Sequence, residues 1–99
     1  MSPLQRLRLP NELVAFMSHL PPTIKVKLRY ALDDLLSDPH LGKPLRAELI
    51  GWWSLRVGRF RIIYRTRESV LEIIAIGPRS TIYSELSERL KKIKSPHGH

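Results

Sequence analysis

Arginine side chains on a predicted β-hairpin are the groups of this sequence best suited to chemistry on an anion. Over residues 52–83 apolar residues alternate with period two, which predicts three short antiparallel strands followed by the start of a helix. Gly58 suits the first central position of a two-residue type II′ turn. That turn places Arg56 directly opposite Arg61, where like charges normally destabilise a sheet. We therefore expect an anionic group to bind there.

Two more side chains are expected beside this arginine pair. Gly77-Pro78 ends the third strand, Arg79 begins the predicted helix, and Tyr83 follows one helical turn later on the same side. Guanidinium groups are always charged and can grip phosphate in a bidentate manner. The convergence of Arg56, Arg61, Arg79 and Tyr83 predicts a phosphate-binding or phosphoryl-transfer site.

The predicted hairpin register separates two faces of the sheet. The face assigned to the core is almost wholly apolar and carries Trp53, Leu55, Val57, Phe60, Ile62, Tyr64, Leu71, Ile73 and Ala75. The basic face carries Trp52, Ser54, Arg56, Arg61, Ile63 and Arg65. On this reading Arg61 has no neighbouring carboxylate, whereas Arg65 lies roughly across from Glu72 on the third strand.

Periodicity and turn residues define the remaining elements. The predicted order is a strand over 4–9, helices over 11–20 and 23–35, a loop over 37–44, an ambiguous stretch over 45–51, three strands and a final helix from residue 79. This pattern indicates an α+β fold of order β-α-α-β-β-β-α. Its helices would cover one face of a small, antiparallel, twisted sheet of about four strands. We expect one domain over residues 1–94 and a disordered tail over 95–99.

The composition of the chain limits the kinds of molecule that it is expected to bind. The 99 residues contain 17 Lys and Arg against 9 Asp and Glu, a net charge of +8 that favours nucleic acid as a partner. There is no cysteine, and the four histidines show no metal-ligand spacing, so no metal and no cofactor are expected. No apolar run approaches the roughly 20 residues of a membrane span, and Arg6 and Arg8 interrupt any signal-peptide core. We expect a cytoplasmic protein without a membrane partner.

The hairpin and the segment after it resemble the RelE/ParE superfamily of bacterial toxins. The resemblance rests on the motif Ser-Leu-Arg-Val-Gly-Arg-Phe-Arg-Ile-Ile-Tyr, a third apolar strand, and Ile-Gly-Pro-Arg with a tyrosine four residues later. The element order also matches, so the resemblance covers nearly the whole chain. It implies that a cognate antitoxin protein silences the chain. It also implies that the chain enters the ribosomal A site and cuts mRNA without a metal.

The resemblance assigns the family's site residues to Arg56, Arg61, Arg79 and Tyr83. RelE itself has two lysines on the strand before the hairpin turn, and the matching positions here hold Trp52 and Ser54. The sequence therefore does not identify the residue that acts as general base.

The chemistry implied is attack of the ribose 2′-OH on the adjacent phosphorus. In this interpretation Arg61 and Arg56 hold the scissile phosphate, Arg79 stabilises the transition state or assists the leaving oxygen, and Tyr83 stacks on or orients a base. The catalytic candidates are thus Arg61, Arg79 and Tyr83, and the candidates for substrate binding are Arg56, Ser54, Trp52 and Arg65. Glu48 is a candidate base, although an ion-pair role is the stronger interpretation.

Structural interpretations compete for two of these residues: Tyr83 as a half-buried anchor of the last helix, and Trp52 as a packing residue. Two other functions remain open. A ParE-like toxin would inhibit DNA gyrase with the same fold and no nuclease site, and an RNA-binding module would bind without chemistry.

Overall fold

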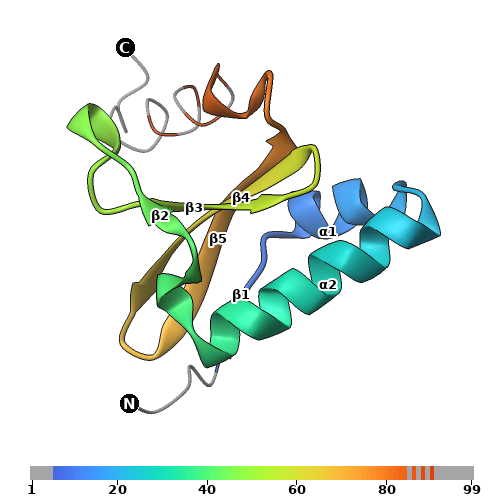
Figure 1. Ribbon diagram of the computed structural model, residues 1–99, viewed down its shortest axis with the longest axis horizontal. Coiled ribbons are helices and arrows are strands. Elements are labelled where there is room, and N and C mark those ends of the chain that lie inside the picture. Colours follow the sequence, from blue (N-terminus) through green and yellow to red (C-terminus); the bar gives the residue numbers. More distant parts are fainter. Residues whose placement is uncertain (1–5, 85, 87, 89, 91–99) are drawn as a thin grey trace.

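The computed structural model describes residues 6–84, 86, 88 and 90, and only the backbone of residue 48 (Figure 1). Its elements are β1 (Arg6–Arg8), α1 (Asn11–Ser18), α2 (Pro22–Ser37), β2 (Lys43–Pro44), β3 (Trp53–Val57), β4 (Phe60–Arg67) and β5 (Val70–Pro78). Short 3-10 turns lie at Pro39–Leu41 and Ala47–Leu49. Residues 82–84, 86, 88 and 90 are helical and are called the C-terminal helical segment. The tail predicted at 95–99 lies outside the described residues.

The sheet is mixed and has five strands in the order β1-β5-β4-β3-β2. The α+β class is confirmed, but two details of the predicted sheet are wrong. β1 joins the sheet parallel to β5, because α1 and α2 carry the chain from one edge of the sheet to the other before β2 begins. The predicted loop over 37–44 also contributes the two-residue strand β2, in which Pro44 is tolerated because the strand lies at an edge.

The helix pair α1 and α2 covers one face of the sheet. Pro22 occupies the first turn of α2, where its missing N–H costs no helical hydrogen bond. The buried face of α2 consists of Leu28, Ala31, Leu32 and Leu35. It packs on Ile62, Tyr64, Leu71, Ile73 and Ile76 of the sheet to form the main core. Burying each such aliphatic side chain stabilises the fold by about 1.5–3 kcal/mol.

A β-bulge changes the expected alternation in β5. Ile63 pairs with Ala75 and Tyr64 pairs with Ile73, so Ile74 is an extra residue on β5. As a result Ile74 and Ala75 face the side opposite α1 and α2, while Ile76 returns to the main core. The prediction that Ala75 extends the helix-pair face is therefore wrong.

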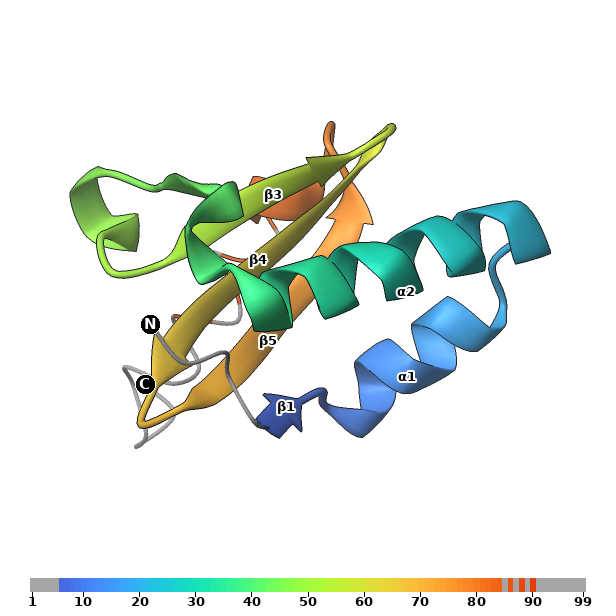
Figure 2. The same ribbon diagram turned by 60° about the horizontal axis from the view of Figure 1, so that its bottom comes forward.

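The second face of the sheet is also partly covered. The C-terminal helical segment packs there, and α1 and α2 lie on the other side of the sheet (Figures 1 and 2). This second core consists of Trp52, Ile63, Ile74, Ala75, Ile82, Leu86 and Leu90. The expectation that all helices cover one face is wrong, because the bulge supplies apolar side chains to both faces. No helix among the described residues has the length and hydrophobicity that crossing a bilayer requires.

Candidate functional site

The β3–β4 hairpin has the predicted register. Gly58 has a φ of 61°, and Arg59 does not share a positive φ, as a type II′ turn requires. Arg56 pairs with Arg61 across the ladder. The glycine turn thus sets two guanidinium groups side by side on the face that carries the C-terminal helical segment.

Arg61 occupies the centre of the candidate site. It lies on the middle strand β4 between Arg56 on β3 and Gly77 on β5, and the glycine places no side chain next to it. The half-buried guanidinium donates from Nη1 to Ser54 Oγ over 3.1 Å. Its Nε is buried without a hydrogen-bond partner. Arg61 therefore has donor capacity that no protein group satisfies.

Arg56 leaves its charge equally uncompensated. Its side chain is exposed, and Nε makes only a long hydrogen bond of 3.4 Å to the Gly58 carbonyl oxygen. Within the described part of the chain the ion pairs are Arg8–Glu72, His40–Asp38 and Arg65–Glu72, none of which involves Arg56 or Arg61. Two adjacent cations without a carboxylate repel each other, and a bound phosphate would remove that repulsion.

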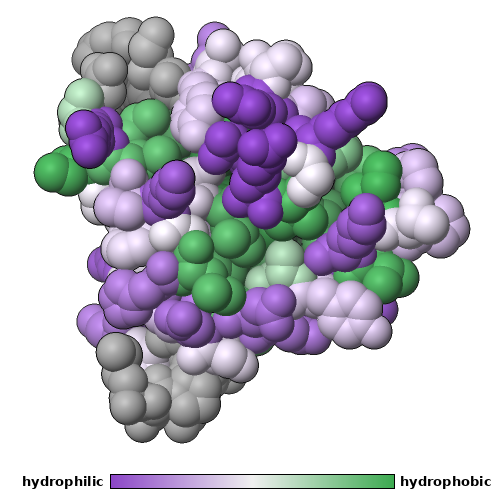
Figure 3. Space-filling view, viewed as in Figure 1, coloured by the Kyte–Doolittle hydropathy of each residue, from purple (hydrophilic) through white to green (hydrophobic). Residues whose placement is uncertain are grey.

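Arg79 is brought to the same end of the sheet. Its backbone N–H donates to the Arg59 carbonyl oxygen over 2.9 Å, which ties the end of β5 to the hairpin turn. Both Arg79 and Arg59 are exposed. In Figure 3 hydrophilic side chains gather over the region of the β3–β4 hairpin and the end of β5. The helix predicted to begin at Arg79 begins instead at Ile82, after a turn closed by a hydrogen bond from Thr81 N to Pro78 O.

Tyr83 lies beside the second core. It is half-buried and packs against the cluster that contains Ile82 and Leu86. This contact anchors the C-terminal helical segment on the sheet and still leaves part of the ring exposed. Both the anchoring and the ligand-facing interpretations of Tyr83 are compatible with this position.

Trp52 and Arg65 contact other protein groups and do not belong to the arginine cluster, the name used below for Arg56, Arg61 and Arg79. Arg65 Nε lies 2.6 Å from Glu72 Oε1, as the predicted cross-strand position requires, and its guanidinium carbon lies 4.3 Å from the centroid of the Trp52 ring. Trp52 is only 8% exposed within the second core. The indole in this conformation serves as a packing surface and a platform for Arg65, with little area open to a nucleic-acid base.

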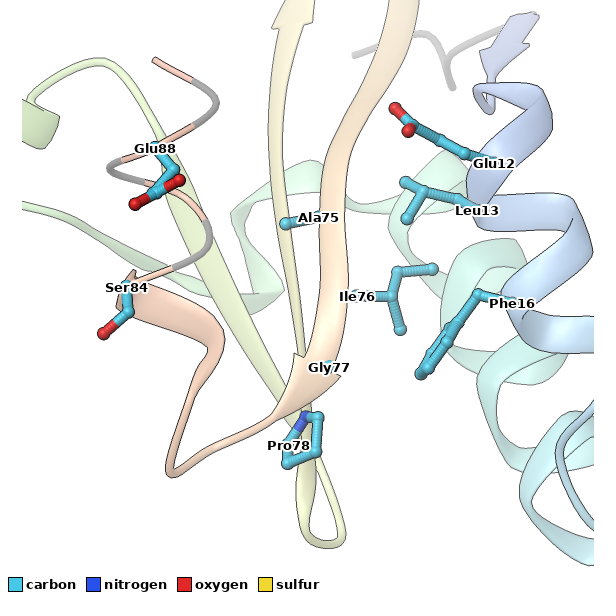
Figure 4. Close-up of a pocket in the computed structure, with 9 residues that line it drawn as sticks. All are labelled: Glu12, Leu13, Phe16, Ala75, Ile76, Gly77, Pro78, Ser84 and Glu88. Atoms are coloured by element: carbon cyan, nitrogen blue, oxygen red, sulfur yellow. The ribbon is translucent and has the colours of Figure 1, made fainter. Parts of the chain in front are cut away.

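A cleft beside β5 does not suit an anion. It has a volume of about 490 Å³ and lies between α1 and the C-terminal helical segment (Figure 4). Carboxylates of Glu12 and Glu88 flank it on opposite sides, and the rest of its lining is mainly apolar. A phosphate group is therefore expected to bind at the surface around Arg61 and not in this cleft. The candidate base Glu48 has its backbone in the turn Ala47–Leu49, and its side chain lies outside the described structure.

Tyr64 is a positioning residue that sequence reasoning assigned only to the core. Its hydroxyl donates to the Pro39 carbonyl oxygen over 2.7 Å and accepts from Gly42 N over 3.1 Å. A side chain at position 42 would not fit, since a Cβ there would lie 2.5 Å from this hydroxyl. Burial raises the pKa of Tyr64 above its ordinary value, and the Gly42 hydrogen bond opposes the shift. The hydroxyl fixes the segment that leads into β2.

Arg59 is the other residue that sequence reasoning left out of the site. The predicted hairpin turn nevertheless places it beside Arg56 and Arg61 in the sequence. Its backbone contact with Arg79 depends on the register of β5, which the bulge obscures in the sequence.

Comparison with known proteins adds a family to this geometry. A family model described as "ParE toxin of type II toxin-antitoxin system, parDE" matches residues 8–83. Toxin RelG of Mycobacterium tuberculosis is 38% identical over 68 residues, which cover 65% of this chain and 78% of the relative. Among solved structures, the RelBE2 toxin-antitoxin complex of M. tuberculosis contains a chain that is 32% identical, with a TM-score of 0.68, 81% of this chain covered and 95% of that one. The isolated RelE toxin of E. coli shares the fold, with a TM-score of 0.63 at 20% identity over 86% of this chain and 97% of that one.

Proposed function

Because the chain belongs to the RelE/ParE superfamily of toxins of type II toxin-antitoxin systems, we propose that it is a RelE-like endoribonuclease that cleaves mRNA on the ribosome. Relatives named as RelG and RelE toxins, each 38% identical, support the RelE-like branch of the superfamily. The proposed partners are mRNA, the ribosomal A site and a cognate antitoxin. The proposed location is the cytoplasm, where these partners meet.

The arrangement of Arg56, Arg61 and Arg79 is the observation that carries this proposal. The sheet register and the bond between β5 and the hairpin turn bring three cations to one end of the sheet, and no described carboxylate pairs with them. Arg61 in addition has a buried donor without a partner. A purely structural surface would gain stability by pairing or removing one of these charges.

The reaction proposed is an intramolecular transesterification. The ribose 2′ oxygen forms a bond to phosphorus, the bond from phosphorus to the 5′ oxygen breaks, and the products carry a cyclic phosphate and a 5′-hydroxyl. One proton leaves the 2′-OH, and one proton reaches the 5′ oxygen. Charge on the pentavalent phosphorus is stabilised by guanidinium groups that are already in place.

Each arginine has a distinct part in this reaction. Arg61 and Arg56 hold the non-bridging oxygens of the scissile phosphate, and Ser54 orients Arg61 through the hydrogen bond of 3.1 Å. Arg79, at the exposed end of β5, stabilises the transition state on the side of the leaving oxygen. Tyr83 presents the exposed part of its ring to a base of the mRNA.

Proton transfer is shared between the chain and the ribosome in this proposal. The two family lysine positions hold Trp52 and Ser54, and neither an indole nor a serine hydroxyl titrates near neutral pH, so neither replaces a lysine as an acid or a base. Glu48 is the carboxylate of this chain that is closest in sequence to β3 and remains the candidate base.

The antitoxin is proposed to neutralise the arginine cluster. The chain carries a net charge of +8, so an acidic segment of the antitoxin would be attracted to this face and would compete with RNA for the same guanidinium groups. The M. tuberculosis RelBE2 and Pyrococcus horikoshii RelE-RelB structures are both toxin-antitoxin complexes, which supports a partner of this kind.

Induction in bacterial cells without an antitoxin tests the proposal. New 5′-hydroxyl ends should appear within translated reading frames of mRNA, and they should be absent with an Arg61→Ala, Arg79→Ala double variant. Growth arrest without new mRNA ends would contradict the nuclease.

One observation favours a second function, since the matching family model is the one described for ParE. A ParE-like protein would inhibit DNA gyrase instead of cutting RNA. A supercoiling assay with purified gyrase distinguishes the two: inhibition by both the wild type and the double variant would indicate the gyrase function.

A further inference from the structure

Lys43 lies beside the arginine cluster, on a strand that the sequence does not predict. In the antiparallel pair β2–β3, Lys43 is opposite Ser54 and Pro44 is opposite Trp53. Directly opposed residues project from the same face of a sheet, so Lys43 shares the face of Ser54. Leu45, two residues further on, packs against the second core, which independently places the alternate residues of this segment on that face.

The register also sets the reach of Lys43 toward the proposed phosphate. Opposed residues have Cβ atoms about 4.5–5.5 Å apart, and diagonal neighbours about 7–8 Å. Ser54 is thus the immediate neighbour of Lys43, and Arg56 is its diagonal neighbour. Because lysine carries its charge on a flexible four-carbon stem, its ammonium can meet an anion held by Arg56 and Arg61 without a backbone shift.

The backbone of β2 is held on both sides of Lys43. Gly42 N donates to the Tyr64 hydroxyl over 3.1 Å, and Leu45 N donates to the Trp52 carbonyl oxygen over 2.8 Å. The Lys43 side chain is exposed and makes no ion pair or hydrogen bond within the described part of the structure. A fixed backbone with a free cationic side chain suits a contact to a ligand.

We infer that Lys43 is a further substrate-contacting cation of this site and that it binds the RNA phosphate held by Arg56 and Arg61. This inference depends on the proposed function in one respect only, namely that the bound anion is RNA. The competing explanation is an ordinary edge-strand lysine that prevents pairing with another chain. Such a lysine would contribute nothing specific to RNA binding.

Salt dependence of RNA binding tests the contact without requiring cleavage. The probe is a fluorescein-labelled single-stranded RNA with 2′-O-methyl groups, which cannot be cut by 2′-OH attack. Loss of one phosphate contact lowers the slope of log K against log salt by about 0.7 for a single strand. We expect this decrease for Lys43→Ala, recovery of the slope with Lys43→Arg, and no change for Lys27→Ala on the exposed side of α2.

A double variant tests whether Lys43 and Arg61 bind the same phosphate. Their losses of binding free energy should be non-additive in Lys43→Ala, Arg61→Gln, because groups that share a partner are coupled. An unchanged slope for Lys43→Ala, or additive losses in the double variant, would overturn the inference. If RNA binding depends on Lys43 but unmodified mRNA is not cleaved on ribosomes, the Lys43 contact would be upheld and the proposed nuclease activity rejected. If the wild type does not bind the free RNA, cleavage of unmodified mRNA on ribosomes decides, and a cleavage rate that Lys43→Ala leaves unchanged would reject the inference while leaving the nuclease in place.

Discussion

Arg61 donates to Ser54 Oγ over 3.1 Å from one nitrogen of its guanidinium while its buried Nε has no partner. This half-satisfied state is costly to a fold, because a buried donor without an acceptor costs about 1–3 kcal/mol. It is useful to a site that must bind an anion. We therefore expect Arg61 to lower the stability of the fold and to be required for function.

Arg61→Gln tests that opposition. The change removes the charge opposite Arg56 but keeps an amide that can reach Ser54, so the unfolding free energy should stay constant or rise by about 0.5 kcal/mol. Cleavage of mRNA should fall by about 100-fold or more, as for loss of a transition-state donor. Urea unfolding and a ribosome cleavage assay measure the two effects. Arg29→Gln on the exposed side of α2 is the matched control and should change neither.

Arg65→Gln should show the reverse pattern. The substitution removes the 2.6 Å contact with Glu72 and the stacking over Trp52. We expect the unfolding free energy to fall by about 1–2 kcal/mol, with the cleavage rate of the folded protein unchanged. A loss of cleavage comparable to that of Arg61→Gln would instead place Arg65 at the substrate, as the sequence interpretation did.

Arg61 and Arg65 show which features of the site can be predicted from the sequence and which cannot. The Gly58 turn defines the register of β3 and β4, and the two-residue turn at Glu68 and Ser69 defines that of β4 and β5. The pairs Arg56–Arg61 and Arg65–Glu72 are therefore both predictable and both confirmed. The role of Arg65 was harder to predict, because it depends on where Trp52 packs. The bulge at Ile74 supplies a second apolar face, on which Trp52 becomes buried, and no period-two pattern reveals such an insertion in advance.

The sheet edges were less predictable than its centre. β2 contains only Lys43 and Pro44, in a segment where turn residues dominate the pattern. β1 was predicted as a strand, but its parallel pairing with β5 depends on the path of α1 and α2 across the sheet. Residues near these edges were consequently omitted from the site, whereas the arginines of the hairpin were not.

Tyr64→Phe should weaken the fold in a pH-dependent way. The buried hydroxyl donates to Pro39 O and accepts from Gly42 N, so its removal should lower the unfolding free energy by about 1–3 kcal/mol at neutral pH. Burial raises the pKa of Tyr64 in the folded state above 10.0, so above that pH the unfolded chain binds fewer protons than the folded one and stability falls. The difference between wild type and Tyr64→Phe should therefore shrink as the pH rises past 10.0.

Urea unfolding at neutral and alkaline pH measures this effect. Tyr30→Phe, at a position that is 67% exposed, is the control and should change stability at neither pH. A stability difference between wild type and Tyr64→Phe that is constant across this range would show that the phenol does not carry the alkaline sensitivity.

The β4–β5 turn offers a stabilising substitution. Glu68 and Ser69 both have positive φ values, 49° and 67°, as a two-residue type I′ turn requires. Residues other than Gly and Asn adopt such φ values at a cost in free energy. Ser69→Gly should raise the unfolding free energy by about 0.5–1 kcal/mol. Thermal unfolding measures the gain. Ser18→Gly at the end of α1, where φ is not positive, should show no gain. Equal effects at both positions would contradict the turn assignment.

Cleavage by the purified chain on ribosomes programmed with a defined mRNA tests the central claim most directly. We predict fragments that end in a 2′,3′-cyclic phosphate and begin with a 5′-hydroxyl, produced by the wild type and lost with Arg61→Gln. Intact mRNA with the wild type would contradict the account. Fragments with 5′-phosphate ends, or equal cleavage by Arg61→Gln, would likewise show that the arginine cluster does not perform the proposed chemistry.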